Sequence, residues 1–132
     1  MLKKKKLSKK LVSKWSLKKP LYLLKTDERY AKHAKQLKTN GFSDSETWSL
    51  YEPITEFVLP RLIRFREIRI SNPIGLTPEE WDGIIGEMIF AFDWSLNSDD
   101  YSKLTVKEVN ANWKRYQKGM NLFAKWFQDL WW

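Results

Sequence analysis

The residues best suited to chemistry in this sequence are the lysines of its first 19 positions. An ammonium group binds phosphate as a point charge, and many of them together release counterions from a polyanion, so such binding weakens steeply as salt rises. Lysine does not form the paired hydrogen bonds with which arginine reads base edges, so any nucleic-acid binding should select weakly among sequences. We predict contacts to a polyanion or another partner from Lys3, Lys4, Lys5, Lys6, Lys9, Lys10, Lys14, Lys18 and Lys19.

The same segment also has an apolar side. Leu7, Leu11 and Trp15 are four residues apart, which predicts a basic amphipathic helix over residues 6–18 that ends before Pro20. Such a helix can also bind an anionic membrane surface, with its apolar side chains inserted and its lysines among the headgroups. A solubilising tail without a specific ligand is a third interpretation. Trp15 is a candidate anchor for a partner.

The charge of the chain is strongly asymmetric. Residues 1–40 hold 14 Lys and Arg against 2 Asp and Glu, a net charge of +12, whereas residues 41–132 hold 10 against 14, a net charge of −4. A basic arm on a mildly acidic body is typical of proteins that meet nucleic acid, an anionic membrane or another polyanion. We therefore predict a basic arm over residues 1–19 and one helical domain over residues 20–132.

Two further groups are candidates for partner binding. Four arginines follow one another along a predicted helix, where surface charge is the default interpretation, but they can also extend the footprint of the arm on phosphates; they are Arg61, Arg64, Arg66 and Arg69. Three tryptophans near the chain end, Trp126, Trp131 and Trp132, exceed what the last helix needs for packing. They either fold back onto the core or anchor a partner, and we single out Trp131 and Trp132 as anchors.

The sequence contains few residues of the types, and in the arrangements, that catalysis requires. His33 is the one histidine, and its lysine-rich helix predicts that it lies at the surface; without cysteine, an ordinary zinc or copper site cannot form within one chain. The carboxylates have no diagnostic spacing, and there is neither a glycine-rich phosphate loop nor a nucleophile elbow. A carboxylate-dependent nuclease is the activity whose residue types are at least present. We expect no enzymatic activity, no metal and no cofactor.

The absence of cysteine fits a reducing cytosol. Leu11 and Val12 are followed almost at once by lysines, so no secretory signal is expected, and no apolar run approaches the length of a membrane span.

The first predicted helices depend on capping residues and prolines. Thr26 is the expected cap of a helix that ends at Asn40 and Gly41, and Ser43 with Glu46 has the spacing of a capping box. Two prolines, at positions 53 and 60, each remove an amide donor and should break or kink the helical segment in which they lie. We expect a short helix and then a longer, bent one.

A further helix should start at Thr77 and Pro78 and form the centre of the core. Its wide apolar face and its two glycines, Gly83 and Gly86, should let another helix approach closely; the face consists of Trp81, Ile84, Ile85, Met88, Ile89 and Phe92.

The last helix repeats apolar residues with a heptad spacing, at positions 106, 109, 113, 116, 120, 123, 127 and 130. This stripe can pack into the domain or form a coiled-coil seam between two chains, and its bulky aromatics favour packing into the domain. Together the patterns predict an all-α fold, a compact bundle of about four to five helices with a basic N-terminal arm.

Several segments resemble a family of small uncharacterised bacteriophage proteins. The segments are GFSDSETW at 41–48, LPRL at 59–62, EWD at 80–82, MIFAF at 88–92, and residues 119–131, and the resemblance covers about residues 20–131. The family carries no assigned activity, so the resemblance implies a phage origin and an expected location in the host cytoplasm. The family often has an aspartate where this chain has Tyr51 and Glu52.

Small phage proteins without enzymatic activity often redirect host machinery. The resemblance and the charge together suggest an inhibitor that binds a host protein or ribonucleoprotein, such as an anti-CRISPR or other anti-defence protein. A nucleic-acid-binding protein of phage DNA metabolism or packaging is the main alternative, and a virion structural component is the third. The sequence leaves the oligomeric state open.

Overall fold

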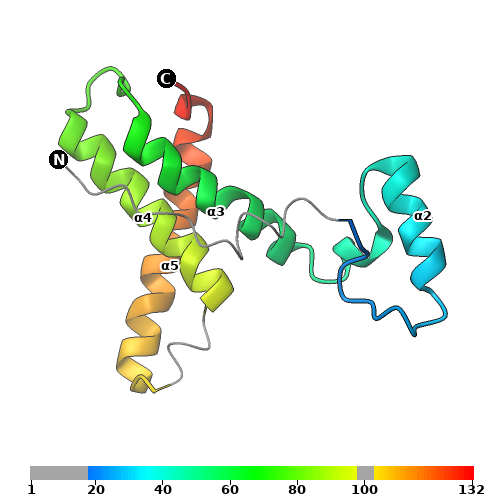
Figure 1. The fold of residues 1–132 in the computed structure, drawn as a ribbon. Coiled ribbons are helices and arrows are strands. Elements are labelled where there is room, and N and C mark those ends of the chain that lie inside the picture. Colours follow the sequence, from blue (N-terminus) through cyan, green and yellow to red (C-terminus); the bar gives the residue numbers. More distant parts are fainter. Residues whose placement is uncertain (1–17, 98–102) are drawn as a thin grey trace. The chain divides into compact units, whose positions relative to one another are not determined.

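The computed structural model describes residues 18–97 and 103–132, and all regular elements in this part of the chain are helical. Figure 1 shows their order, which confirms the all-α prediction. The predicted amphipathic helix over 6–18 lies outside the described residues, apart from Lys18. The elements are α2 (Tyr30–Asn40), the 3-10 helix η1 (Asp44–Thr47), α3 (Tyr51–Ile68), α4 (Pro78–Asn97), α5 (Val106–Trp126) and the 3-10 helix η3 (Phe127–Asp129).

The described chain forms two compact units. Unit 1 contains Val58–Trp132, and unit 2 contains residues 18–57. Helix α3 contributes its first turns to unit 2 and the rest to unit 1. The predicted boundary between an arm and a body after residue 19 stays a prediction. None of the helices in the described part of the chain combines the length and the apolar character that a membrane span requires.

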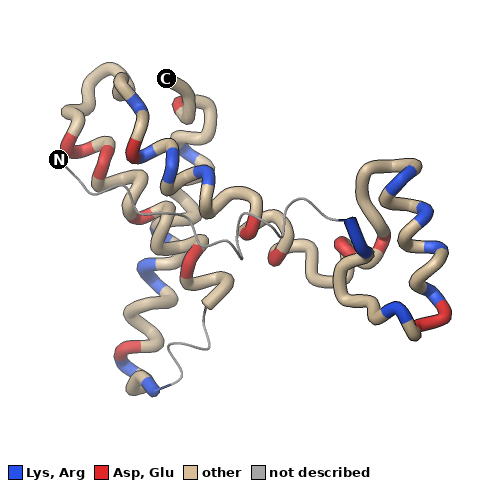
Figure 2. The backbone as a smooth tube through the Cα atoms, in the orientation of Figure 1, with Lys and Arg blue, Asp and Glu red and all other residues tan. Residues whose placement is uncertain are grey.

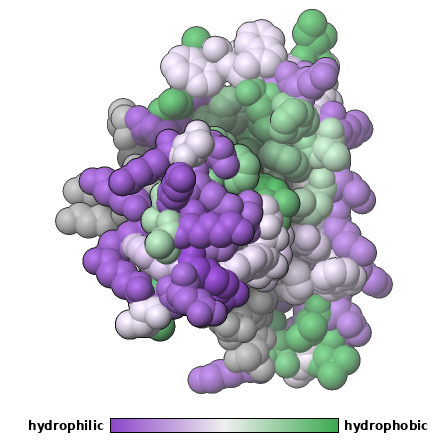
Figure 3. All heavy atoms as spheres, turned by 90° about the vertical axis from the view of Figure 1, so that its right-hand side faces the viewer, coloured by the Kyte–Doolittle hydropathy of each residue, from purple (hydrophilic) through white to green (hydrophobic). Residues whose placement is uncertain are grey.

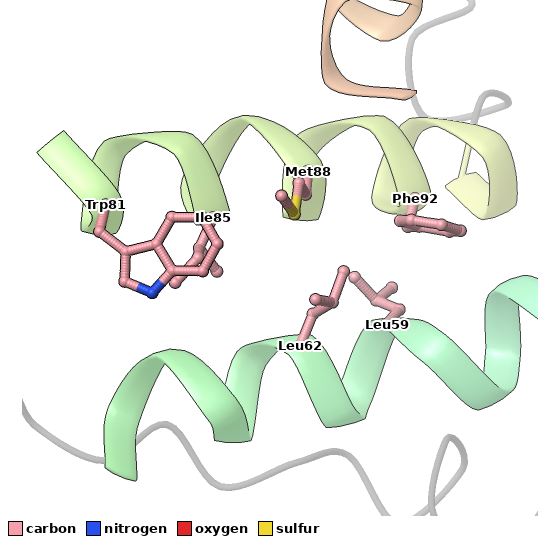
Figure 4. Packing of buried hydrophobic residues seen from close by; sticks show 6 residues of the cluster. All are labelled: Leu59, Leu62, Trp81, Ile85, Met88 and Phe92. Atoms are coloured by element: carbon pink, nitrogen blue, oxygen red, sulfur yellow. The ribbon is translucent and has the colours of Figure 1, made fainter. Parts of the chain in front are cut away.

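Helix α4 forms the centre of unit 1, as predicted. Its start is a capping box, because the Thr77 hydroxyl accepts from the backbone N–H of Glu80 at 3.1 Å and the Glu80 carboxylate accepts from the N–H of Thr77 at 2.8 Å. One face of the helix is buried against α3, and Figure 4 shows the two rows of side chains opposite each other. These side chains are Trp81, Ile85, Met88 and Phe92 from α4 and Leu59 and Leu62 from α3.

The close approach between helices occurs at Gly119 of α5, and not at Gly83 or Gly86 as predicted. A Cβ atom at Gly119 would collide with the carbonyl oxygen of Glu87 and would lie 2.6 Å from the Cβ of Ala91. A Cβ at Gly83 would meet nothing within 4 Å, and one at Gly86 would meet only the guanidinium of Arg66. The prediction that Gly83 and Gly86 allow close helix contact is therefore wrong, because both lie off the face that α5 crosses.

The heptad stripe of α5 is only partly covered. Met120, Phe123 and Leu130 pack against the core of unit 1, whereas Val106 is 79% exposed and Val109 and Trp113 are also exposed. Packing of the stripe into the domain is thus confirmed for Met120, Phe123 and Leu130, and it is wrong for Val106, Val109 and Phe127, which are exposed. The reason is the length of the neighbouring helix, since Trp94, in the last turn of α4, already meets Trp113 and Tyr116, and α5 continues beyond it.

In unit 2, the end of α2 is predicted correctly and its start is not. Gly41 adopts the left-handed conformation, with φ of +80°, that ends a helix. The helix begins at Tyr30, so Thr26 is not its cap. Asp27 instead holds the preceding turn, because its carboxylate accepts from the backbone N–H of Arg29 at 2.9 Å and pairs with the Arg29 guanidinium at 2.9 Å.

The capping box predicted at Ser43 and Glu46 is present, with the Glu46 carboxylate 2.7 Å from the backbone nitrogen of Ser43. It starts the short helix η1, and the longer α3 comes after it. Helix α3 continues through Pro53 and Pro60, so neither proline breaks it. Pro53 lies in the first turn, where a backbone N–H has no partner within the helix in any case.

Candidate functional site

The predicted arginine group is engaged within unit 1. Arg66 donates two hydrogen bonds to Asp82, at 3.0 and 2.7 Å, and Arg69 lies 3.4 Å from the same carboxylate. The hydrogen bond from Arg66 holds the pKa of Asp82 below its ordinary value. Arg64 pairs with Glu67 at 3.0 Å, and Arg61 is exposed. The structure thus brings Arg66 and Arg69 together around one acid, and their binding of a polyanion stays a prediction.

The lysines of the arm and Trp15 lie outside the described residues, except that Lys18 and Lys19 are exposed. A second set of lysines, which sequence reasoning did not single out, lies on α2. Lys32, Lys35 and Lys38 are all exposed and have no ion-pair partner among the described residues. Figure 2 shows the basic positions spaced along this helix, and Figure 3, in which unit 2 faces the viewer, shows its largely hydrophilic surface.

Their spacing explains why these three lysines share one side of α2. Residues three apart differ by about 60° around a helix, so three of them spread over roughly 120° of its surface. The i, i+3, i+6 spacing was the available sequence signal. This signal is weaker than that of the arm, in which lysines are much more densely spaced.

His33 is buried, with 6% of its surface exposed, so the prediction of a surface histidine is wrong. Its Nδ1 accepts a hydrogen bond from the backbone N–H of Ser45 at 3.2 Å, and its ring meets Trp48 edge to face at a centroid distance of 5.6 Å. The first amides of a helix lack acceptors within it, and the imidazole supplies one to η1. The neighbouring lysines misled the prediction because they occupy the opposite side of α2.

Other polar groups surround His33 in the interior of unit 2. Ser43 and Ser45 are fully buried, and their hydroxyl oxygens are 2.6 Å apart. Because Nδ1 of His33 accepts a hydrogen bond, the hydrogen-bond pattern assigns the ring proton to Nε2. This arrangement provides an acceptor for the backbone N–H of Ser45 and leaves neither serine hydroxyl at the surface. Its role is therefore structural.

Tyr22 attaches the segment before α2 to the first turn of α3. Its hydroxyl donates a hydrogen bond to the Glu52 carboxylate, and burial together with this carboxylate raises the pKa of Tyr22. Tyr22 has a φ of +65°, which a bulky side chain rarely adopts. The hydrogen bond to Glu52 holds this strained residue in place.

Of the three tryptophans near the chain end, Trp126 folds back onto the core and two lie at the surface, where their role as partner anchors stays a prediction. Trp126 folds back, with its ring edge to face with Trp81 at 5.8 Å. Trp131 and Trp132 are 69% and 57% exposed. Large aromatic side chains held at the surface are typical of protein interfaces.

A pocket of about 370 Å³ in unit 1 is lined in part by Trp131. The α3–α4 turn and the chain end form its walls, so residues more than 50 positions apart in the sequence meet there. Its lining consists of Ser71, Asn72, Pro73, Ile74, Trp126, Asp129 and Trp131. Among these residues Asp129 carries the only charge, which makes the pocket apolar with one acidic side.

Two buried donors near the core of unit 1 have no hydrogen-bond partner: Nε of Arg69 and Nε1 of Trp126. Within residues 18–97 and 103–132, no three histidine, aspartate or glutamate side chains gather as they would around a metal ion.

Comparison of the chain with protein-family models, curated proteins and solved structures finds no match. The resemblance to a phage family stays a prediction.

Proposed function

We propose that this protein acts by binding a host protein or ribonucleoprotein, without catalysis of its own, through the aromatic surface at the end of unit 1. The observation that carries this proposal is the exposure of Trp131 and Trp132 at the chain end, where Trp131 lines a pocket. Ile74, which lines the same pocket, is exposed, and so is Phe127 near the chain end. Keeping such large apolar side chains in water is unfavourable, and a patch of them marks an interaction surface.

The charge and the resemblance suggest which partner this is. Ribonucleoproteins combine a protein surface, which suits the aromatic end of unit 1, with a phosphate backbone, which suits the lysines of the arm and of α2. Small phage proteins of this kind often inhibit nucleic-acid-guided defence complexes. We therefore propose an anti-defence inhibitor of the anti-CRISPR type, acting in the host cytoplasm.

A pull-down of the full chain from host lysate at physiological salt tests the proposal, with and without nuclease. One discrete protein or ribonucleoprotein should stay bound after nuclease treatment, and it should be lost with the double variant Trp131→Ala/Trp132→Ala. The matched control is Lys107→Gln/Lys114→Gln, which replaces two exposed lysines of α5 that have no part in the proposed surface. Bulk nucleic acid that disappears on nuclease treatment, with no discrete protein retained, would overturn the proposal.

A second experiment tests the inhibitor assignment itself. Expression of the full chain in cells that carry an active nucleic-acid-guided defence system should restore plating of a phage that the system targets. The double tryptophan variant should restore plating less well at equal protein level. Unchanged interference in every defence system of the host would remove the inhibitor assignment and leave only the binding function.

Direct binding of free nucleic acid is the second candidate, and the three unpaired lysines on α2 favour it. If Lys32, Lys35 and Lys38 all contact phosphates of a duplex, their replacement by glutamine should lower the slope of log affinity against log salt by about 3, since each contact contributes about 0.9. The matched control is replacement of Lys114, Lys118 and Lys125 on α5. Equal effects of the two triple variants would show that α2 has no special part in such binding.

A further inference from the structure

We infer that the pocket at the end of unit 1 is a recognition site for an arginine side chain of the protein partner. This inference rests on the proposed function and names the chemical group of the partner that the aromatic surface binds. It depends on three properties of the pocket: its aromatic walls, its one acid and its unused acceptors.

The aromatic walls are provided by Trp126 and Trp131, whose indole rings attract a cation more strongly than any other aromatic side chain. Trp126 already interacts with one cation in the protein, since the ammonium of Lys125 lies 5.2 Å from its ring centroid. Lys125 is not among the residues that line the pocket. Trp131 is largely exposed and has no such neighbour among the described residues.

The acid of the pocket is Asp129, and its carboxylate has no hydrogen-bond or ion-pair partner among the described residues. The contrast with other acids of unit 1 is clear, because Asp82 and Glu87 are each paired with an arginine, at 2.7 and 2.9 Å. No lysine or arginine lines the pocket. Its charge therefore complements a cation and disfavours an anion.

The third property concerns hydrogen bonds. The amide nitrogen of Asn72 donates to the carbonyl oxygens of Leu76 and Pro73, which leaves the side-chain oxygen as an acceptor. Ser71 adds a hydroxyl oxygen that makes no hydrogen bond among the described residues. The pocket thus offers several acceptors around one acid, which matches a group that only donates.

These properties favour arginine over lysine. A guanidinium is flat, so it stacks on an indole ring, and it has five donors in a fixed plane that match a carboxylate and an amide oxygen together. Pro73 and Ile74 also line the pocket and add apolar surface, which suits the aliphatic stem of the same side chain or an apolar neighbour in the peptide.

The test uses the purified full chain and an acetylated, amidated tripeptide with arginine between two alanines. Titration is followed by two-dimensional ¹⁵N–¹H spectra, in which the indole N–H of each tryptophan gives its own signal. We expect a saturable shift of the Trp131 signal with the arginine peptide and none with the peptide in which citrulline, its uncharged analogue, replaces arginine. A lysine peptide should bind more weakly.

Variants assign the effect to the pocket. Asp129→Asn should weaken the arginine peptide about tenfold, because a charged acceptor is replaced by a neutral one. Glu79→Gln, which neutralises an exposed acid in the first turn of α4 away from the pocket, should leave it unchanged. Trp131→Ala should abolish the saturable shift of the remaining signals, whereas Phe42→Ala, which removes an exposed ring of unit 2, should preserve it. Circular dichroism confirms that each variant is folded.

Three results would overturn the inference: no saturable shift with the arginine peptide, an equal response to citrulline, or equal effects of Asp129→Asn and Glu79→Gln. These results are distinguishable from failure of the proposed function. If the peptide does not bind but the pull-down still retains a partner that is lost with the double tryptophan variant, the function stands and only the arginine assignment falls. If the peptide binds and no partner is retained, the arginine site stands and the proposed function falls.

Discussion

The interiors of the two units are built from different residues. Unit 1 buries large apolar side chains, with Trp81, Ile85 and Met88 at its centre. Unit 2 buries mainly polar ones, including His33 and Ser45. Its buried apolar side chains, among the described residues, are Pro20, Leu23 and Pro53.

This difference determines how each unit is held together. Apolar burial contributes free energy roughly in proportion to area and without directional requirements, so unit 1 should provide most of the stability of the chain. A buried hydrogen bond contributes little net free energy, but a buried donor that loses its acceptor is costly. Unit 2 should therefore be less stable and more sensitive to the loss of single polar partners.

The largest effect is expected from removing the central ring of unit 1. Trp81→Ala should lower the free energy of unfolding by about 3–5 kcal/mol, because the ring is buried and the surrounding helices cannot fully close the cavity. Urea unfolding followed by helical circular dichroism measures this loss. Trp132→Ala, which removes an exposed ring, is the control and should change the midpoint little. Equal midpoints for the two variants would contradict the placement of the core.

The next effect tests the contact between α4 and α5. Gly119→Ala should destabilise unit 1 by about 1–3 kcal/mol, since its new methyl group meets the backbone of Glu87 and only part of the cost is recovered by better helix propensity. Gly83→Ala is the matched control. Its methyl group meets nothing, so it should stabilise the helix by about 0.5–1 kcal/mol. Thermal unfolding of both variants gives the comparison, and shifts of the same sign would contradict it.

Replacing a buried polar side chain of unit 2 should lower the stability of unit 2 and leave that of unit 1 unchanged. His33→Phe keeps a ring of similar size but removes the acceptor for the backbone N–H of Ser45, at an expected cost of about 1–2 kcal/mol. Hydrogen exchange should then speed up about 5- to 30-fold at the amides of unit 2 that open with it. The amides of α4 should exchange at their original rates. Faster exchange throughout the chain would show that the two interiors are not independent.

The smallest effect concerns an ion pair at the surface of the unit 1 core. The pKa of Asp82 is lowered in the folded protein, so the carboxylate stabilises the fold above its ordinary pKa near 4, and this contribution is lost as the pH falls further. Asp82→Asn should cost about 1 kcal/mol at neutral pH, because both partners are partly exposed. Its unfolding free energy should also depend less on pH below about 4 than that of the unchanged chain.

Glu79→Gln is the control for Asp82→Asn, because Glu79 is exposed and has no ion-pair partner among the described residues. It should leave the acid dependence of stability almost unchanged. If the two variants lose stability in parallel as the pH falls, the pair between Arg66 and Asp82 does not contribute as its geometry indicates.

The starts and ends of the helices were largely determined by local sequence. Gly41, the box at Ser43 and Glu46, and the helix start at Thr77 and Pro78 act where they are predicted, because each depends on residues within one turn of the chain. The apolar face of α4 was also readable, since its spacing follows from helix geometry alone. Thr26 failed as a cap because Asp27, one residue later, holds a competing turn.

Tertiary structure alone decided the features that need residues far apart in the sequence. Which glycine lies at the helix crossing depends on how α5 meets α4, and this selected Gly119 over Gly83 and Gly86. The burial of His33 depends on an amide 12 residues away, and the pocket depends on a turn and a chain end more than 50 positions apart. Local patterns specify backbone conformation, whereas contacts between distant segments specify which side chains are buried, paired or left free to bind.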